Sequence, residues 1–224
     1  MKRLRVAVSC ALLAALVGCS NGQVKPENYS GFIGDYSMLA PATAPSGAPL
    51  LRWVDPQADV RRYQRIYIEP SRFYPVPKPN DKVSAKTLAD ITTYYDQALR
   101  RELGKSLPLA SAPGPGILVL KPAITAVSSH TQGLRPYEVI PIALIAAGMS
   151  TAVGIRDQDT QIATEAMLLD GGDNKVLAKM VRQGTGKALD DSDQPITGDD
   201  VKAVLDGWAA DMRMSYEKTL GSRR

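Results

Sequence analysis

The feature that most constrains this chain is an N-terminal segment that ends at the last cysteine of the sequence. Three basic residues among the first five precede an uncharged apolar stretch over residues 6–17, which is too short to span a bilayer and is typical of a signal peptide. Of the two cysteines, Cys10 lies inside this stretch and Cys19 follows it. Removal of residues 1–18 leaves no pair of thiols, so a packed core and not a disulfide must stabilise the fold.

The end of the signal, Leu16-Val17-Gly18-Cys19, resembles the lipobox that the lipoprotein signal peptidase cuts. The alternative is an ordinary signal peptide that happens to end in cysteine. The resemblance implies that the thiolate of Cys19 takes up a diacylglyceryl group and that the residue carries up to three acyl chains. One chain gives only marginal membrane binding and several give lasting anchorage, so Cys19 predicts the membrane as a partner. Ser20 stands where similar inner-membrane lipoproteins carry aspartate, which favours the outer membrane, facing the periplasm.

Cleavage also changes the charge of the chain. The mature chain keeps 24 of the 27 Lys and Arg residues against 23 Asp and Glu, so its formal charge is +1 and not +4. The apparent basicity therefore gives no reason to expect nucleic acid as a partner. Hydrophobic residues make up 44% and charged residues 22% of the sequence, a globular composition that excludes a fully disordered chain.

Behind the signal the sequence predicts two parts. Residues 19–50 are rich in Ser, Gly, Ala and Pro and form a flexible lipidated tether, and residues 51–221 form a single periplasmic domain. One island over residues 29–41 is too apolar for a spacer. We expect it to dock on the domain or on a partner through Tyr29, Phe32 and Tyr36.

The pattern within the domain predicts an α+β fold. Strand signals lie at 65–69, at 117–127 with a break at Pro122 that suggests an edge or a bulge, and in a hairpin around the turn 170–175. An amphipathic helix begins after the N-cap Ser84, and the last helix follows a capping box in Thr197-Gly-Asp-Asp200. This order indicates a mainly antiparallel sheet with two amphipathic helices packed on it, and Trp208 as a core anchor.

Residues 139–155 form an uncharged apolar segment. Residues 141–155 as a helix would reach roughly 22 Å, which is short of a hydrocarbon core of about 30 Å. The segment packs on its own domain, forms an oligomer or partner interface, or covers a small-ligand pocket. Helical spacing would align small residues that permit close approach of a second helix. These candidate interface residues are Ala143, Ala147, Ser150, Thr151 and Gly154.

Catalytic patterns are incomplete. Gly148-Met-Ser-Thr-Ala152 matches a nucleophile elbow around Ser150, but the hydrolase order needs a downstream histidine and the only histidine, His130, lies upstream. Gly184-Thr-Gly-Lys187 lacks the first glycine and the Ser or Thr of a phosphate-binding loop, so we interpret it as a strand-exit turn. The aspartates between 190 and 200 lack the glycine and glutamate of a calcium loop. A serine hydrolase is thus a remote alternative, and we expect no catalytic residue, metal or cofactor.

Several motifs carry a resemblance to a known family. Ser30-Gly-Phe-Ile-Gly-Asp-Tyr-Ser-Met-Leu39, Arg52-Trp-Val-Asp-Pro56 and Ile66-Tyr-Ile-Glu-Pro70 are similar to a family of uncharacterised bacterial lipoproteins, domain of unknown function 3313. The resemblance implies no activity, cofactor or catalytic residue. The sequence therefore predicts a non-enzymatic, lipid-anchored envelope module that binds an envelope protein or its own copies, with a small-ligand or lipid-handling protein as the alternative.

Overall fold

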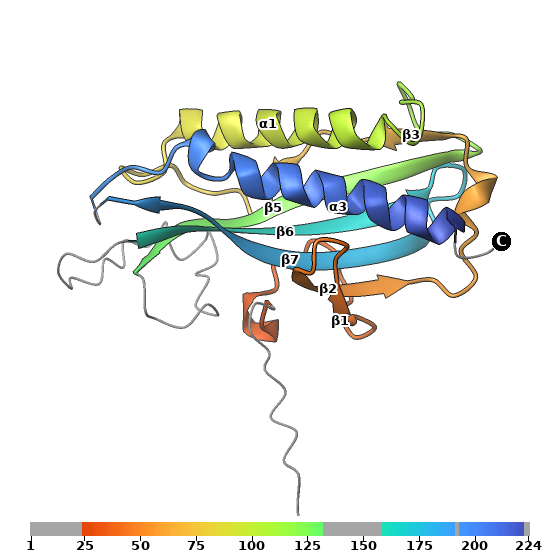
Figure 1. Ribbon diagram of the computed structural model, residues 1–224, viewed down its shortest axis with the longest axis horizontal. Helices are drawn as coiled ribbons and strands as arrows, with labels where there is room; N and C mark the ends of the chain where they lie inside the picture. The colour runs from red at the N-terminus through yellow and green to blue at the C-terminus, as the bar shows by residue number, and fades with distance from the viewer. Residues whose placement is uncertain (1–23, 132–157, 191–192, 222–224) are drawn as a thin grey trace, which may run out of the picture.

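The computed structural model describes residues 24–131, 158–190 and 193–221, which form an α+β domain (Figure 1). Its mixed sheet has the strand order β1-β2-β7-β6-β5-β3, and β4 also pairs with β5. The strands are β1 (Ala40–Thr43), β2 (Pro49–Val54), β3 (Arg65–Ile68), β4 (Arg72–Phe73), β5 (Ile117–Thr131), β6 (Gln158–Asp170) and β7 (Val176–Leu189). Only β3 and β4 run parallel to their neighbour, so the prediction of a mainly antiparallel sheet is confirmed.

Two helices lie side by side on one face of the sheet: α1 (Ala85–Leu103) and α3 (Lys202–Gly221) (Figure 1). Short 3-10 turns occur at Pro26–Asn28, Val60–Arg62 and Gly198–Asp200. The predicted caps are present. Ser84 Oγ accepts the Thr87 N–H at 3.0 Å, and the Asp200 carboxylate accepts the Thr197 N–H at 2.7 Å. The first bond satisfies an amide donor in the first turn of α1, and the second satisfies the amide of the N-cap residue of the 3-10 turn that precedes α3.

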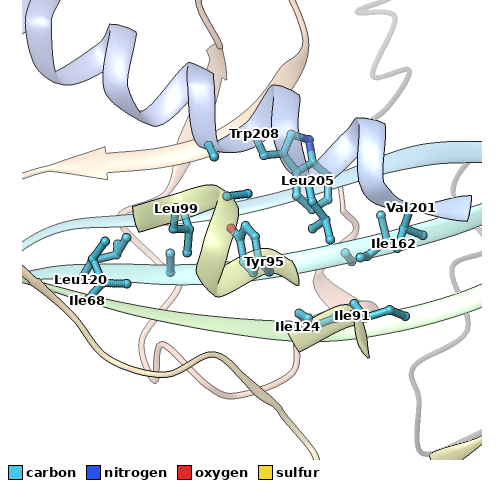
Figure 2. Close-up of a cluster of buried hydrophobic side chains, with 14 of the residues drawn as sticks. Ile68, Ile91, Tyr95, Leu99, Leu120, Ile124, Ile162, Val201, Leu205 and Trp208 are labelled. Atoms are coloured by element: carbon cyan, nitrogen blue, oxygen red, sulfur yellow. The ribbon is translucent and has the colours of Figure 1, made fainter. Parts of the chain in front are cut away.

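The main core fills the space between the helices and the sheet. Figure 2 shows Tyr95 and Leu99 of α1 and Trp208 of α3 directed toward the strands, where they meet Leu120 and Ile162. Burial raises the pKa of Tyr95 to about 12, so its phenol is neutral inside this layer. Trp208 is buried in this cluster, as the sequence predicts.

The sheet begins earlier than the sequence predicts. β1 and the first residues of β2 lie within the range assigned to the tether, and Ala40–Thr43 pairs with residues 49–52. Residues from Val24 onward are also packed on the domain. The folded domain therefore begins before residue 51, where the sequence predicts its start. The apolar side chains scattered among Pro, Gly and Ser pack on the sheet, and local composition does not reveal these distant contacts.

Strand β5 runs through Pro122 without a break and lies inside the sheet, with a bulge between Ile124 and Ala126. The Leu120 and Ile124 carbonyls accept amide protons from the β3–β4 side, those of Glu69 and Tyr74. Every second residue of a strand faces the same neighbour, so Pro122 also faces this side, at the interruption between β3 and β4. Its missing N–H therefore removes no bond from a continuous ladder.

The predicted strand-exit turn at 184–187 is wrong, because these residues lie inside β7. Their glycines admit the last helix instead. A Cβ on Gly184 would stand 2.9 Å from Val204 Cγ1 and 3.0 Å from Trp208 Cζ2, and one on Gly186 would meet the Asp200 carbonyl oxygen at 2.1 Å. Glycine here is required by the close approach of α3 and its preceding turn to the sheet.

A matched pair of substitutions tests this close approach. Gly184→Ala should lower the free energy of unfolding by about 1–3 kcal/mol, because the new methyl group overpacks the Val204 and Trp208 contact. Gly207→Ala on the open side of α3, where a Cβ meets nothing within 4 Å, should raise it by about 0.5–1 kcal/mol. Urea unfolding followed by circular dichroism measures both, and equal stabilities of the two variants would contradict the packing argument.

Candidate functional site

The face of the sheet opposite the helices is covered by residues 24–39, which we call the N-terminal cover. Val24 and Ile33 of the cover are buried against Leu51 of β2 and Val181 of β7. This second, smaller apolar cluster is separate from the main core under the helices. The N-terminal segment is therefore part of the folded domain from Val24 onward.

A buried carboxylate fastens the cover to the sheet. Glu165 of β6 is only 1% exposed. Its Oε1 accepts the Ser30 N–H at 2.9 Å and its Oε2 accepts the Tyr36 hydroxyl at 2.7 Å. An ionised carboxylate inside a protein is costly unless donors replace its lost hydration. Both donors come from the cover, so the cover offsets the free-energy cost of burying the Glu165 carboxylate.

The aromatic residues of the cover are held in place together. Tyr29 and Tyr36 stack with ring centroids 4.2 Å apart. Burial, and then the hydrogen bond to Glu165, raises the pKa of Tyr36 far above its ordinary value, so the hydroxyl stays protonated and remains a donor. Lys179 of β7 adds a bond from its ammonium group to the Asp35 carbonyl at 2.7 Å. The island thus docks on its own domain, one of the two outcomes that the sequence predicts.

The structure places three of the candidate interface residues within this cover: Tyr29, Phe32 and Tyr36 pack against the second apolar cluster. Tyr36 is committed to the sheet, whereas Phe32 lies at the border of the cover, 5.6 Å from the ring of Tyr74. Their role in an interface with another molecule stays a prediction. The lipidation residue and the small-residue candidates lie outside the described residues: Cys19, Ala143, Ala147, Ser150, Thr151 and Gly154.

A second buried charge lies on the helix side of the sheet. The guanidinium of Arg182 donates to the Asp211 carboxylate at 2.7 Å, and the side chains are 1% and 4% exposed. The guanidinium carbon stands 4.8 Å from the centre of the Trp208 ring. The N–H and hydroxyl of Ser46 also donate to Asp211, each at 2.9 Å. This pair joins β7, α3 and the loop after β1.

An apolar cavity of about 180 Å³ lies next to this pair, between the second half of α3 and the sheet. Leu118, Leu120, Ala166 and Met180 are among the strand residues that line it, and Met212 and Tyr216 of α3 line the opposite wall. The charged residues in its lining are Arg52, Lys179, Arg182 and Asp211. Engineered apolar cavities of about 150 Å³ bind benzene-sized guests, so this space can hold a small apolar group.

The catalytic candidate Ser150 lies outside the described residues, so the structure tests only the metal candidates. Among residues 24–131, 158–190 and 193–221 there is no group of three or more His, Cys, Asp or Glu side chains placed to hold a metal ion. Asp199 and Asp200 serve the start of α3 instead: Asp199 pairs with Lys202, which lowers the pKa of that carboxyl, and Asp200 caps the helix. Neither helix of the described part is long and apolar enough to span a bilayer.

Sequence reasoning missed Glu165 and the Arg182–Asp211 pair. Glu165 alternates with the apolar residues of β6 and has the spacing of an ordinary solvated side chain. Arg182 follows Val181 within a strand, and Asp211 stands three residues after Trp208, on the face of α3 that packs on the sheet. A charged residue at a core-facing helical position is a signal that could have identified Asp211.

The fold and the site define a class of protein: an α+β domain whose sheet carries two helices on one face and an N-terminal segment clamped on the other. The comparisons are more specific. The chain belongs to the family of proteins of unknown function DUF3313, whose model matches residues 28–212.

Two curated relatives support this membership. The chain is 40% identical over 210 residues to the uncharacterized lipoprotein YdcL of Escherichia coli K12, covering 94% of both chains, and the same figures hold for YdcL of E. coli O157:H7. Among solved structures, the PelC dodecamer from Paraburkholderia phytofirmans is similar at a TM-score of 0.37 and 10% identity, over 72% of this chain and 96% of that chain. A likeness at that level says nothing about what this chain does.

The clamp on the cover is tested by removing one hydroxyl. Tyr36→Phe should lower the free energy of unfolding by about 1.5–3 kcal/mol, because a buried carboxylate loses one of its donors. Tyr29→Phe keeps the stacked ring and both Glu165 hydrogen bonds, so it is the matched control and should change stability little. Urea unfolding measures both variants. A Tyr36→Phe protein as stable as the control would show that the bond to Glu165 does not hold the cover.

Proposed function

We propose that this protein is a non-enzymatic lipoprotein of the bacterial cell envelope, anchored through acyl chains on Cys19 in the outer membrane with its domain in the periplasm. The signal over residues 1–18 and the lipoprotein relatives support the anchor, and Ser20 after the acylated cysteine supports the outer membrane. The buried charges support a non-catalytic role. The carboxylates of Glu165 and Asp211 both have partners inside the protein: Glu165 bonds to the cover, and Asp211 bonds to Arg182, whose Nε has no hydrogen-bond partner among the described residues.

The observation that carries the proposal is the burial of Val24, only five residues after Cys19. Five residues span at most about 18 Å when fully extended, whereas the predicted tether to residue 50 would reach about 110 Å. An acylated Cys19 would thus hold the domain next to the bilayer, whereas a flexible tether up to residue 50 would let it move far from the membrane. The partners of such a domain are molecules at or near the membrane surface: an envelope protein or a second copy of this chain.

The anchor is tested through three substitutions near the signal cleavage site. The wild type should enter the detergent phase of Triton X-114 and carry acyl mass on its first residue, and Cys19→Ser should stay in the aqueous phase. Cys10→Ser, which lies within the signal, is the matched control and should behave as wild type. Ser20→Asp should move the protein to the inner-membrane fraction. An aqueous wild type with an unacylated terminus would refute the anchor, and no change with Ser20→Asp would refute the sorting.

Association with a partner or with itself is tested on the same protein. A signal-less Cys19→Ser form should elute as an oligomer by size exclusion with light scattering, or the full-length protein should cross-link to an envelope protein in cells. Ala147→Trp should abolish the contact, because a large side chain prevents the close approach that small residues permit. Ala203→Trp on the exposed side of α3 is the control. A monomer with no cross-linked partner would contradict this part of the proposal.

The cavity under α3 favours a second candidate function, the binding of a small apolar or lipid-derived ligand. The pocket that the sequence predicts under residues 139–155 lies outside the described part of the chain. The wall of the cavity is mainly aliphatic, with Leu50, Leu103 and Met212 among its members. The buried Arg182–Asp211 pair could orient a polar end of a bound molecule.

Native mass spectrometry on protein purified from its own host tests this candidate. The expected result is a co-purified small molecule that is lost in Ala178→Leu, which narrows the cavity, and kept in Ala203→Leu, which adds the same volume on the exposed side of α3. Thermal unfolding of each variant verifies that it is folded. A clean apo mass for the wild type would eliminate this function.

A further inference from the structure

Two exposed apolar side chains lie on or beside the N-terminal cover: Met38 and Tyr74. Within the described residues, the exposed large apolar side chains are Met38, Val54, Tyr74 and Val76. Met38 belongs to the cover, and Tyr74 packs its ring 5.6 Å from that of Phe32. Val76, two residues further along, is 86% exposed. A single exposed valine needs no explanation, but Val76 follows closely on Tyr74 and so adds to the apolar surface that Phe32 and Tyr74 form.

The same stretch carries positive charge and is stiff. Arg72 lies over the Phe32 ring at 5.1 Å, Lys78 is exposed, and residues 72–79 contain no carboxylate. Prolines at 75, 77 and 79 alternate with Tyr74, Val76 and Lys78, and each fixes its own φ angle. A stretch that is already rigid loses little entropy when it binds. Tyrosine, an exposed aliphatic residue and flanking cations are the composition that settles in the headgroup region of a bilayer.

The position of the anchor brings a bilayer to this surface. The five-residue connection from Cys19 ends at Val24, which is buried in the same apolar cluster as Ile33. Phe32 packs against that cluster and also contacts Tyr74 and Arg72. The chain therefore enters the domain on the face where Phe32 meets Tyr74 and Arg72. The helices lie on the other face of the sheet (Figure 1).

We propose that Phe32, Arg72, Tyr74, Val76 and Lys78 form a membrane-docking surface that lies on an anionic phospholipid bilayer. Tyr74 and Val76 enter the headgroup region, and Arg72 and Lys78 face lipid phosphates. This inference rests on the proposed acylation of Cys19, which places the bilayer within reach. It orients the domain: the cover faces the membrane, and α1 and α3 face the periplasm, where they are accessible to partners.

The experiment uses the full-length lipidated protein in vesicles of phosphatidylethanolamine and phosphatidylglycerol. The sulfur of an acylated Cys19 is blocked, so Val76→Cys supplies a single thiol for the environment-sensitive dye NBD. Gly207→Cys on the open side of α3 is the matched control. We expect NBD at residue 76 to brighten several-fold and to be quenched by spin-labelled lipid, and NBD at residue 207 to remain quenched by aqueous iodide. Equal accessibility of both dyes to iodide would overturn the proposal.

Two further measurements separate the alternatives. Flotation with the vesicles reports the anchor independently of the dyes: a protein that floats with both dyes in water keeps its anchor and lacks the docked surface, whereas one that fails to float lacks the anchor itself. Dilution to about one protein per vesicle tests a second copy as the occupant. If the brightening at residue 76 disappears on dilution and lipid spin labels never quench it, the surface binds another protein copy and not the bilayer.

Lys78→Glu should weaken lipid quenching at residue 76, because it reverses a charge that faces the phosphates.

Discussion

The hydrogen bonds that Glu165 accepts from the N-terminal cover are the interaction on which the rest of the arrangement depends. A carboxylate at the centre of a sheet, 1% exposed, is costly unless hydrogen bonds replace its hydration. Ser30 and Tyr36 supply these bonds, so the sheet holds residues that composition alone would assign to a tether. Because the cover is part of the fold, Val24 is buried beside Ile33. The folded domain therefore begins only five residues after Cys19.

The two faces of the sheet therefore have different roles. On one face, α1 and α3 bury the main core, and the Arg182–Asp211 pair stands beside an apolar cavity under the second half of α3. On the other, the cover brings together the entry point of the chain, the Phe32 and Tyr74 rings and the cation of Arg72. A domain built in this way has a side from which its anchor emerges and a side that the anchor leaves free. For a lipoprotein, that polarity decides which surface a partner or ligand can reach.

Local signals predicted most of the elements and few of the contacts between them. Ser84 before α1, the capping box at Thr197 and the glycines of the 170–175 turn act within a few residues of the chain, and each formed the element that its pattern indicates. Gly184, Glu165 and Arg182 could not be interpreted in this way, because their roles depend on partners far along the chain. Gly184 is explained by the approach of Trp208, Glu165 by Tyr36 and Arg182 by Asp211.

The sequence by itself determined the signal peptide pattern, the α+β class and the order of β3, α1, β5, β6, β7 and α3, because these depend on composition and on periodicity over short stretches. Only the tertiary structure decided where the domain begins, which face of the sheet the N-terminal segment covers, and that a cavity lies under α3. The reason is physical. Burial of a charge or of an aromatic ring is favourable only when a complementary surface is present, and here that surface comes from strands that lie more than a hundred residues away along the chain.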